Sequence, residues 1–314
     1  MTRTRIAALG LSTLTLLLAA APVQAQAAGK KVTIGLAVAN LQANFFNQIK
    51  QSVERTAKAQ GITVITVDAK GDSATQVSQI QDLVARNVDA IIYIPAGATA
   101  AAVPVRTARA AGIPVVNVDR NAAGAPGDTF IATDSVAAAQ TLGDYVCKQT
   151  GGKGNVAIIQ GQLGTTPEQD RDKGFSQALA KCTGLKVVAK QASNAWAQDE
   201  GFNIAQDMLQ KTPDITVFFG RADALALGAA QAAKVAGLGG KVMVVGFDGD
   251  TAGLQAVQSG TLSATMTQRT QYMGQLAVKS ALDLINKKSV PKVQLQAATL
   301  TTKANVAPFL KTHP

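Results

Sequence analysis

Histidine, cysteine and the common catalytic motifs are scarce or absent in this sequence. Histidine occurs once, at position 313, and cysteine twice, so no cluster has the ligand types and spacing of a zinc site. The chain contains no G-x-S-x-G turn, no Walker A loop, no C-x-x-C pair and no set of kinase motifs. Asp68, Asp119 and Asp248 follow strand-like runs, but no candidate nucleophile accompanies them. The sequence therefore predicts a protein that binds a ligand without a cofactor, a metal or enzymatic chemistry.

The sequence also has no apolar run of the roughly 20 residues that a membrane-spanning helix needs. Its most apolar stretch, residues 6–21, follows Arg3 and Arg5 and precedes small residues that allow cleavage near Ala25 or Ala27. This order is typical of an export signal peptide, with a membrane anchor as the less favoured alternative. Because no cysteine follows the apolar stretch, a lipid anchor is not expected. We predict a soluble protein in the periplasm.

Clusters of one charge sign are missing as well. The formal net charge is +10, and removal of residues 1–27 lowers it to +8, because that segment holds two arginines and no acid. Lysine and arginine form no run that alternates with aromatic residues. Nucleic-acid binding is therefore not expected, and the basic charge is interpreted as solvated surface.

The two cysteines, Cys147 and Cys182, are far apart in the sequence. An even count in an exported protein favours a disulfide between them, with two buried thiols as the alternative. Each cysteine ends an amphipathic stretch, one before and one after a strand-like run at residues 155–160. A disulfide at these helix ends would lie at the edge of the sheet opposite to the carboxyl ends of the strands.

Short apolar runs alternate with longer alanine-rich amphipathic stretches along the chain, which predicts α/β architecture. The strand-like runs form two sets of four, at residues 32–38, 62–68, 90–94 and 114–118, and at 155–160, 185–190, 215–218 and 241–246, followed by one more at 262–267. The helix-like stretches between them include residues 45–59, 73–86, 135–148, 167–181, 222–235 and 271–286. Two successive sets of β-α units predict two lobes, each a doubly wound parallel sheet covered by helices on both faces.

Aromatic residues make up only 4% of the sequence, yet four of them follow strand-like runs closely. These are Phe45, Phe46, Trp196 and Phe247. In an open α/β sheet this position faces the ligand crevice at the carboxyl ends of the strands. We expect one of Phe45 and Phe46 to pack in the core instead, because adjacent helical positions point about 100° apart.

Charged residues occur at the same strand ends, notably the pair Asp119-Arg120. Flat aromatic faces beside carboxylates and guanidinium groups suit a sugar, whose C–H faces stack on rings while its hydroxyls need donors and acceptors. Asp119 and Asp248 could accept hydroxyl hydrogens, Arg120 and Arg171 could donate, and Gln268 could do both. The alternative for Asp119-Arg120 and for Arg171 is an ordinary ion pair between the lobes.

Four segments together resemble the periplasmic sugar-binding proteins of ABC transporters, and most closely their ribose-binding type. The segments are Asn44-Phe45-Phe46, Val118-Asp119-Arg120, residues 161–175 with Arg171, and Val244-Val245-Gly246-Phe247-Asp248-Gly249. The resemblance implies the type I periplasmic binding protein fold, with two lobes joined by a three-segment hinge. The ligand-binding residues that it implies are Phe45, Phe46, Asp119, Arg120, Thr133, Arg171, Trp196, Asp248 and Gln268, with Asn44, Arg221 and Phe247 as further candidates.

The chain departs from the ribose-binding pattern at three amide positions, which here are Ala43, Ile94 and Ala222, while Trp196 replaces a phenylalanine. The missing amides argue against ribose itself. They favour a sugar with fewer hydroxyls at that edge, a polyol, or a differently oriented pentose or hexose. Arg221, beside Ala222, has two open interpretations, as a substitute hydrogen-bond donor or as a surface residue.

The resemblance also divides the chain. It implies a signal peptide at 1–27, an N-terminal lobe at 30–133 plus 269–297, and a C-terminal lobe at 134–268 plus 298–314. The hinge would lie where the chain crosses between lobes, near 133–134, 268–269 and 297–299.

The function implied by the resemblance is capture of a small carbohydrate by a monomeric binding protein and its delivery to the membrane permease of an ABC importer. One alternative is a sugar sensor that docks on a chemoreceptor. Another is a sugar-responsive transcription regulator, which would need a helix-turn-helix at the N-terminus, where this chain has the predicted export signal.

Overall fold

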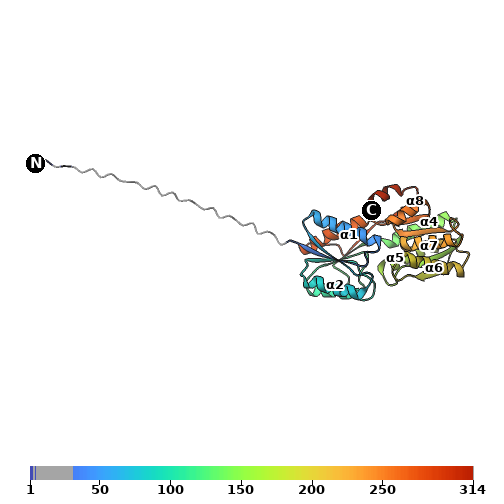
Figure 1. The fold of residues 1–314 in the computed structure, drawn as a ribbon, viewed down its shortest axis with the longest axis horizontal. Helices are drawn as coiled ribbons and strands as arrows, with labels where there is room; N and C mark the ends of the chain where they lie inside the picture. Colours follow the sequence, from blue (N-terminus) through green and yellow to red (C-terminus); the bar gives the residue numbers. More distant parts are fainter. Residues whose placement is uncertain (3, 5–30, 314) are drawn as a thin grey trace. The chain divides into compact units, whose positions relative to one another are not determined.

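Two six-stranded sheets organise the part of the chain that the structure describes, residues 1, 2, 4 and 31–313. The structure is a computed structural model, and all its described helices and strands belong to one compact unit, Lys31–Pro314 (Figure 1). The predicted signal peptide, residues 1–27, lies almost entirely outside the described residues. Among the helices that are described, none is long and apolar enough to cross a membrane.

All neighbouring strands of the first sheet are parallel, and only one strand of the second sheet is antiparallel to its neighbour. The first sheet has the order β11 (Val293–Gln296), β5 (Thr129–Thr133), β4 (Val115–Val118), β3 (Ala90–Tyr93), β1 (Thr33–Val38) and β2 (Thr63–Asp68). The second has the order β12 (Thr299–Thr301), β10 (Ala264–Thr267), β9 (Met243–Asp248), β8 (Val217–Gly220), β6 (Gly154–Gln160) and β7 (Leu185–Ala192), with β12 antiparallel to β10.

Helices cover both faces of each sheet, which explains why the central strands are apolar on both sides. The first sheet packs α1 (Asn44–Ala59) and α9 (Thr270–Ile285) on one face and α2 (Ser73–Ala85) and α3 (Ala102–Ala110) on the other. The second packs α4 (Ser135–Gln149) and α5 (Thr166–Lys181) on one face, and α6 (Gln198–Lys211), α7 (Asp223–Val235), α8 (Thr251–Ser259) and α10 (Ala307–Thr312) on the other. In Figure 1, α1 and α2 lie on opposite sides of the first sheet. The predicted pair of doubly wound sheets is confirmed.

Three chain segments connect the two sheets. The chain leaves the first sheet after β5 and enters α4, which packs on the second sheet. It returns between β10 and α9, and it crosses once more between β11 and β12. The nine strands expected from the sequence are all present, whereas β5, β11 and β12 were not predicted.

The predicted disulfide is present between Cys147 and Cys182, whose Cα atoms are 6.1 Å apart. Cys147 lies in the last turn of α4, and Cys182 is the C-terminal cap of α5. Both helices end beside the start of β6 and β7, since the Gly154 N–H donates to the Gly184 carbonyl there. The bond therefore ties together the amino-terminal edge of the second sheet.

Candidate functional site

A pocket of about 360 Å³ lies between the carboxyl ends of the strands of the two sheets. The loop after β1 and the ends of β4 and β9 contribute to its walls, and so do the first turns of α5, α6, α7 and α8. Eight of the residues expected from the sequence line it, namely Asn44, Phe45, Phe46, Asp119, Arg120, Arg171, Trp196 and Asp248. These residues come from both sheets, so the pocket is complete only where the sheets face each other.

Two phenylalanines form one aromatic wall. The rings of Phe45 and Phe46 meet edge to face, with centroids 5.3 Å apart and planes inclined by 69°. Each is 6% exposed, each belongs to the apolar core of the first sheet, and each lines the pocket. The expectation that the core takes one ring and the ligand the other is therefore wrong. At the start of α1, each ring packs in the core and also lines the pocket.

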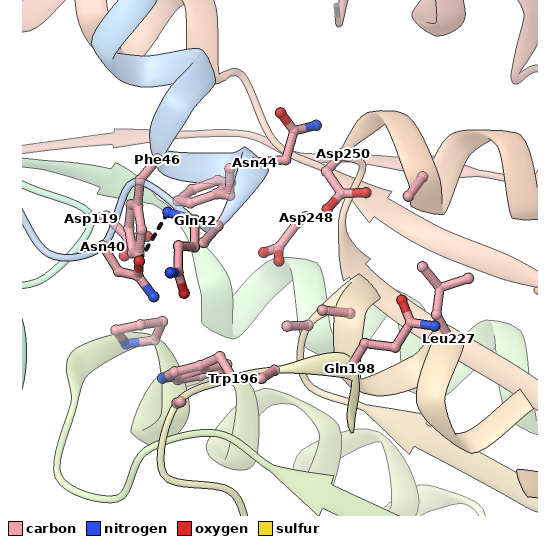
Figure 2. A pocket seen from close by; sticks show the side chains of 18 of the residues that line it. Asn40, Gln42, Asn44, Phe46, Asp119, Trp196, Gln198, Leu227, Asp248 and Asp250 are labelled. Atoms are coloured by element: carbon pink, nitrogen blue, oxygen red, sulfur yellow. Dashed lines mark hydrogen bonds between the residues drawn. The ribbon is translucent and has the colours of Figure 1, made fainter. Parts of the chain in front are cut away.

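Trp196 forms the opposite aromatic wall (Figure 2). Its ring lies on Gly161, where a Cβ atom would be 1.9 Å from the ring, so only glycine fits beneath it. The loop before it is fixed by the Glu200 carboxylate, which accepts from the backbone N–H groups of Asn194 and Ala195 at 3.1 and 2.8 Å. The indole Nε1 is buried and has no hydrogen-bond partner among the described residues.

Arg120 is held at the pocket wall by the backbone of the first sheet. Its Nη1 donates to the carbonyls of Pro95 and Ala96 at 3.1 and 2.8 Å, and its guanidinium lies 5.2 Å from the centroid of the Phe46 ring. Its Nε lies 3.7 Å from Asp119 Oδ2. Burial raises the pKa of Asp119 and lowers the pKa of Arg120, while their mutual attraction opposes both shifts.

Arg171 and Asp248 form the corresponding pair on the second sheet. Arg171 Nη2 lies 3.3 Å from Asp248 Oδ1, and its guanidinium lies 3.9 Å from the centroid of the Phe247 ring. Burial raises the pKa of Asp248 to about 7; Arg171 opposes the rise, and the nearby Asp250 and Asp119 add to it. The pocket therefore presents charged hydrogen-bonding groups that are largely shielded from solvent. Hydrogen bonds from a ligand to such charged groups are stronger than those between neutral groups.

Three predicted residues lie behind the pocket wall and do not line it. Gln268 donates through Nε2 to Asp248 Oδ1 at 2.8 Å and accepts from the Thr133 hydroxyl at 2.5 Å. Phe247 lies under Arg171. Thr133 and Gln268 thus orient the Asp248 carboxylate at the pocket wall, and Phe247 packs against the Arg171 guanidinium.

Arg221 has a different role from either one considered for it. It is fully buried, so it is not a surface residue, and it does not line the pocket. Its guanidinium forms ion pairs with Glu168 and Asp172 and donates to the Glu168 carbonyl at 2.9 Å. Its own carbonyl accepts from Arg171. The Glu168 carboxylate accepts in turn from the N–H of Gly161 at 2.7 Å. This network fixes both the guanidinium of Arg171 and the strand end beneath Trp196.

The sequence missed part of the lining. Polar residues that were not predicted are Asn40, Gln42, Gln198 and Asp250, and apolar ones are Pro167, Ala195, Ala197, Ala224, Leu227 and Ala252. The amides that precede Asn44-Phe45-Phe46 were a signal that could have been used. Among the three departures from the ribose-binding pattern, Ala43 and Ala222 line the pocket, whereas Ile94 is fully buried in the core. Within the described residues, no group of histidine, cysteine or acidic side chains could hold a metal ion.

Comparison with known proteins gives the family. Residues 34–289 match the model of the periplasmic binding protein domain. A ribose import binding protein of Bacillus subtilis is 34% identical over 263 residues, which cover 84% of this chain and 85% of the relative. A xylitol-binding protein of Mycolicibacterium smegmatis is 37% identical over 254 residues, which cover 79% of this chain and 71% of the relative.

Solved structures agree with this result. The solute-binding protein of an ABC transporter from Actinobacillus succinogenes, with bound D-allose, is 29% identical and has a TM-score of 0.83 over 88% of this chain and all of its own. A solute-binding protein from Bacillus halodurans with bound myo-inositol is 28% identical, also with a TM-score of 0.83, over 90% and 98% of the two chains. The matched domain, the relatives and the two facing sheets all lead to one conclusion: this chain belongs to the periplasmic binding protein family.

Proposed function

We propose that this protein captures a small carbohydrate between two hinged lobes in the periplasm and delivers it, as a monomer, to the permease of an ABC importer. The observation that carries this proposal is the pairing of aromatic faces with buried charges in one pocket. Phe46 and Trp196 lie on opposite sides of the space (Figure 2). Asp119, Arg120 and Arg171 also line the pocket. A sugar offers the matching surfaces, C–H faces for the rings and hydroxyls for the charged groups.

Binding would be coupled to closure of the lobes. We assign residues 30–133 and 269–297 to one lobe and 134–268 and 298–314 to the other, with the three crossings as the hinge. A ligand that contacts Phe46 and Asp119 on one lobe and Trp196 and Arg171 on the other binds fully only when the lobes are shut. Its binding energy therefore shifts the population toward the closed form, which the permease would recognise.

Direct hydrogen bonds between the two lobes support this assignment. Asn44 Nδ2 donates to Thr251 Oγ1 at 3.0 Å, and the Asn121 N–H donates to Thr166 Oγ1 at 3.1 Å. Asn44 and Asn121 follow strands of the first sheet, while Thr166 and Thr251 begin α5 and α8 on the second. These four residues act as closing contacts that an open form would lack.

No chemical step is needed for this function. The acids and bases of the pocket are engaged with each other, as in Arg171 with Asp248 and Arg120 with Asp119, and they are arranged to hold hydroxyl groups. The ligands named for the relatives and neighbours are ribose, xylitol, D-allose and myo-inositol, all polyhydroxylated molecules. They share the donor and acceptor pattern that this pocket complements.

The test is a thermal-shift and calorimetric panel of pentoses, hexoses, deoxysugars and polyols on the purified protein. A ligand that binds only the folded state stabilises it by mass action and so raises the melting temperature. The gain in unfolding free energy is about 2.7 kcal/mol at a ligand concentration of 100 Kd. At least one carbohydrate should bind with one-to-one stoichiometry and change the fluorescence of Trp196, the only tryptophan. Binding of amino acids or oligopeptides in place of every carbohydrate would reject the proposal.

A further inference from the structure

One end of the pocket is apolar, and we propose that it is a subsite for a small alkyl substituent on the ligand. The inference rests on the proposed carbohydrate-binding function and deepens it. The apolar subsite consists of Ala197, Ala222, Ala224, Leu227 and Ala252, all of which line the pocket. The ligand would be a monosaccharide or cyclitol that carries a methyl to propyl group at this edge, as a glycoside, an ether or a deoxygenated carbon.

The start of α7 supplies three of the five residues of the apolar subsite, Ala222, Ala224 and Leu227. Ala224 and Leu227 are three residues apart, so they lie on one face of the helix, and both are half-buried at the pocket. Ala222 precedes them as the N-terminal cap of α7, and its side chain makes no capping hydrogen bond. Ala197 caps α6 in the same way. Alanine is among the weaker residues at an N-cap, so these two methyl groups are not explained by helix stability.

Two polar side chains, those of Asp250 and Gln198, line the pocket near the apolar subsite. Asp250 Oδ1 accepts from the Gly253 N–H at 2.7 Å, because it caps α8, and the Asp250 residue is 9% exposed. Gln198 is exposed. Because the side chains of Ala222, Ala224 and Leu227 have no polar atoms, a ligand hydroxyl placed against them would lose its water without a partner from these side chains, which is unfavourable. A methyl group at the same place would gain by burial.

The opposite end of the pocket is polar and charged. In Figure 2, Asn40 and Asp119 lie at one end, Leu227 and Gln198 at the other, and Asp248 between them. A sugar ring between Phe46 and Trp196 would thus direct its hydroxyls toward Asp119 and its substituted edge toward Leu227. The pocket volume of about 360 Å³ falls within the roughly 300–1,000 Å³ of small-molecule sites, which leaves room for a ring with one substituent.

Calorimetry with matched pairs tests the inference on the full-length mature protein. In each pair one hydroxyl of the parent is methylated or replaced by hydrogen: D-ribose and methyl β-D-ribofuranoside, D-galactose and D-fucose, D-glucose and either of its methyl glucopyranosides, and myo-inositol and a mono-O-methyl inositol. In at least one pair the alkylated or deoxygenated member should bind tenfold or more tightly, a difference of about 1.4 kcal/mol.

Three outcomes are distinguishable. A preference for the alkylated member in one pair supports the apolar subsite. Parent sugars that bind as tightly as their partners, or more tightly, in every pair would overturn it and leave the carbohydrate function intact. If no member of any pair binds, the apolar subsite is rejected, and the wider panel of pentoses, hexoses, deoxysugars and polyols decides the proposed function separately.

A single substitution then localises the preference. Ala222→Asn puts an amide in the apolar subsite and also supplies a favoured N-cap residue, so the fold should be retained. We expect it to weaken the preferred alkylated ligand by tenfold or more and to reduce or reverse the discrimination within its pair. The matched control is Ala236→Asn, the same change at the exposed C-terminal cap of α7, which should change neither affinity.

A second variant tests the subsite by size. Leu227→Ala enlarges it, so the affinity for ethyl or propyl derivatives should rise relative to the methyl derivative. Unchanged discrimination in both Ala222→Asn and Leu227→Ala would show that the substituent binds elsewhere and would overturn the inference.

Discussion

The two edges of the second sheet carry opposite kinds of structure. At the carboxyl edge, Arg171, Arg221 and Asp248 are buried charges that are held by neighbouring side chains and carbonyls. At the amino edge, a covalent bond joins Cys147 to Cys182, with glycine turns beside it. Buried charges are costly unless they are paired, whereas a disulfide restricts the unfolded chain without any requirement on the pocket. One sheet thus separates ligand binding from a major source of stability.

Arg221→Met should produce the largest effect at the carboxyl edge. Glu168 would keep a buried carboxylate without its cation, and removal of one partner of a buried pair typically costs about 3–5 kcal/mol of unfolding free energy. Urea denaturation would measure this loss, and ligand affinity should fall too, because the Arg221 side chain fixes the Glu168 carboxylate that holds the Gly161 N–H beneath Trp196. The control is Lys190→Ala, which removes a partly exposed ion pair with Asp172 and should cost at most about 1 kcal/mol. Equal losses of unfolding free energy in the two variants would contradict the claim that the buried ion pair contributes more to stability than the partly exposed one.

At the amino edge, loss of the disulfide should lower stability and leave ligand affinity unchanged. Replacing Cys147 and Cys182 together by alanine opens a loop with a sequence separation of 35, and disulfide removal typically costs about 2–4 kcal/mol. Differential scanning calorimetry should show a lower melting temperature, while calorimetric titration shows the same ligand affinity as wild type. A tenfold loss of affinity in the folded variant would show that the two edges are coupled.

Substitutions at residues that line the pocket should weaken ligand binding. We expect Trp196→Ala to weaken binding by roughly 1–3 kcal/mol, the scale for losing an aromatic contact. Asp119→Ala and Arg171→Ala should each cost about 1.5–3 kcal/mol of binding, the scale of a hydrogen bond to a charged group. Titration calorimetry measures these losses, and circular dichroism checks the fold. Wild-type affinity in any folded variant would remove that residue from the site.

The most gradual expected effect is a pH dependence at Asp248, which is spread over several pH units. Its pKa in the folded protein is raised to about 7, above the ordinary value near 3.9 of an unfolded chain. Between these values the folded state holds a proton that the unfolded state has released, so this group's contribution to stability is fully present below about pH 4 and is lost as the pH rises through 7. The slope is at most about 1.4 kcal/mol per pH unit.

Urea denaturation of wild type and Asp248→Asn at pH 5, 6, 7 and 8 would isolate this contribution. As the pH rises to 7, the unfolding free energy of wild type should fall relative to that of Asp248→Asn. Above pH 8 the difference between the two proteins should change little. A difference that stays constant over this range would mean that Asp248 is ionised throughout.

The sequence was informative where the physical cause is local. Nine of the strands, the helices between them and the aromatic and charged residues at strand ends follow from runs of Val, Ile and Leu and from what comes after them. The short strands β11 and β12 escaped because pairing with a neighbour, and not their own composition, makes them strands: β11 has the half-exposed sequence Val-Gln-Leu-Gln and β12 has three residues. Each of these two pairs with a strand that is distant in the sequence. The strand β5 was missed although its buried sequence, Thr-Phe-Ile-Ala-Thr, favours a strand.

The depth at which a residue lies was decided by tertiary structure. The family resemblance placed Thr133 and Gln268 among the ligand contacts, and its position after a strand made Phe247 a candidate, yet all three lie behind the pocket wall beside Asp248 and Arg171. The sequence left Arg221 between two roles and gave no sign of its pairing with Glu168 and Asp172.

The sequence by itself determined the two doubly wound sheets, the edge at which the site would form and the chemical types gathered there, because strand runs and strand-end residues are properties of short segments. Only the tertiary structure decided which side chains face the pocket, which support them and where the apolar subsite lies. Burial and ion pairing depend on contacts between segments far apart in the chain, such as Arg221 with Glu168 and Asn44 with Thr251, and no local pattern specifies those contacts.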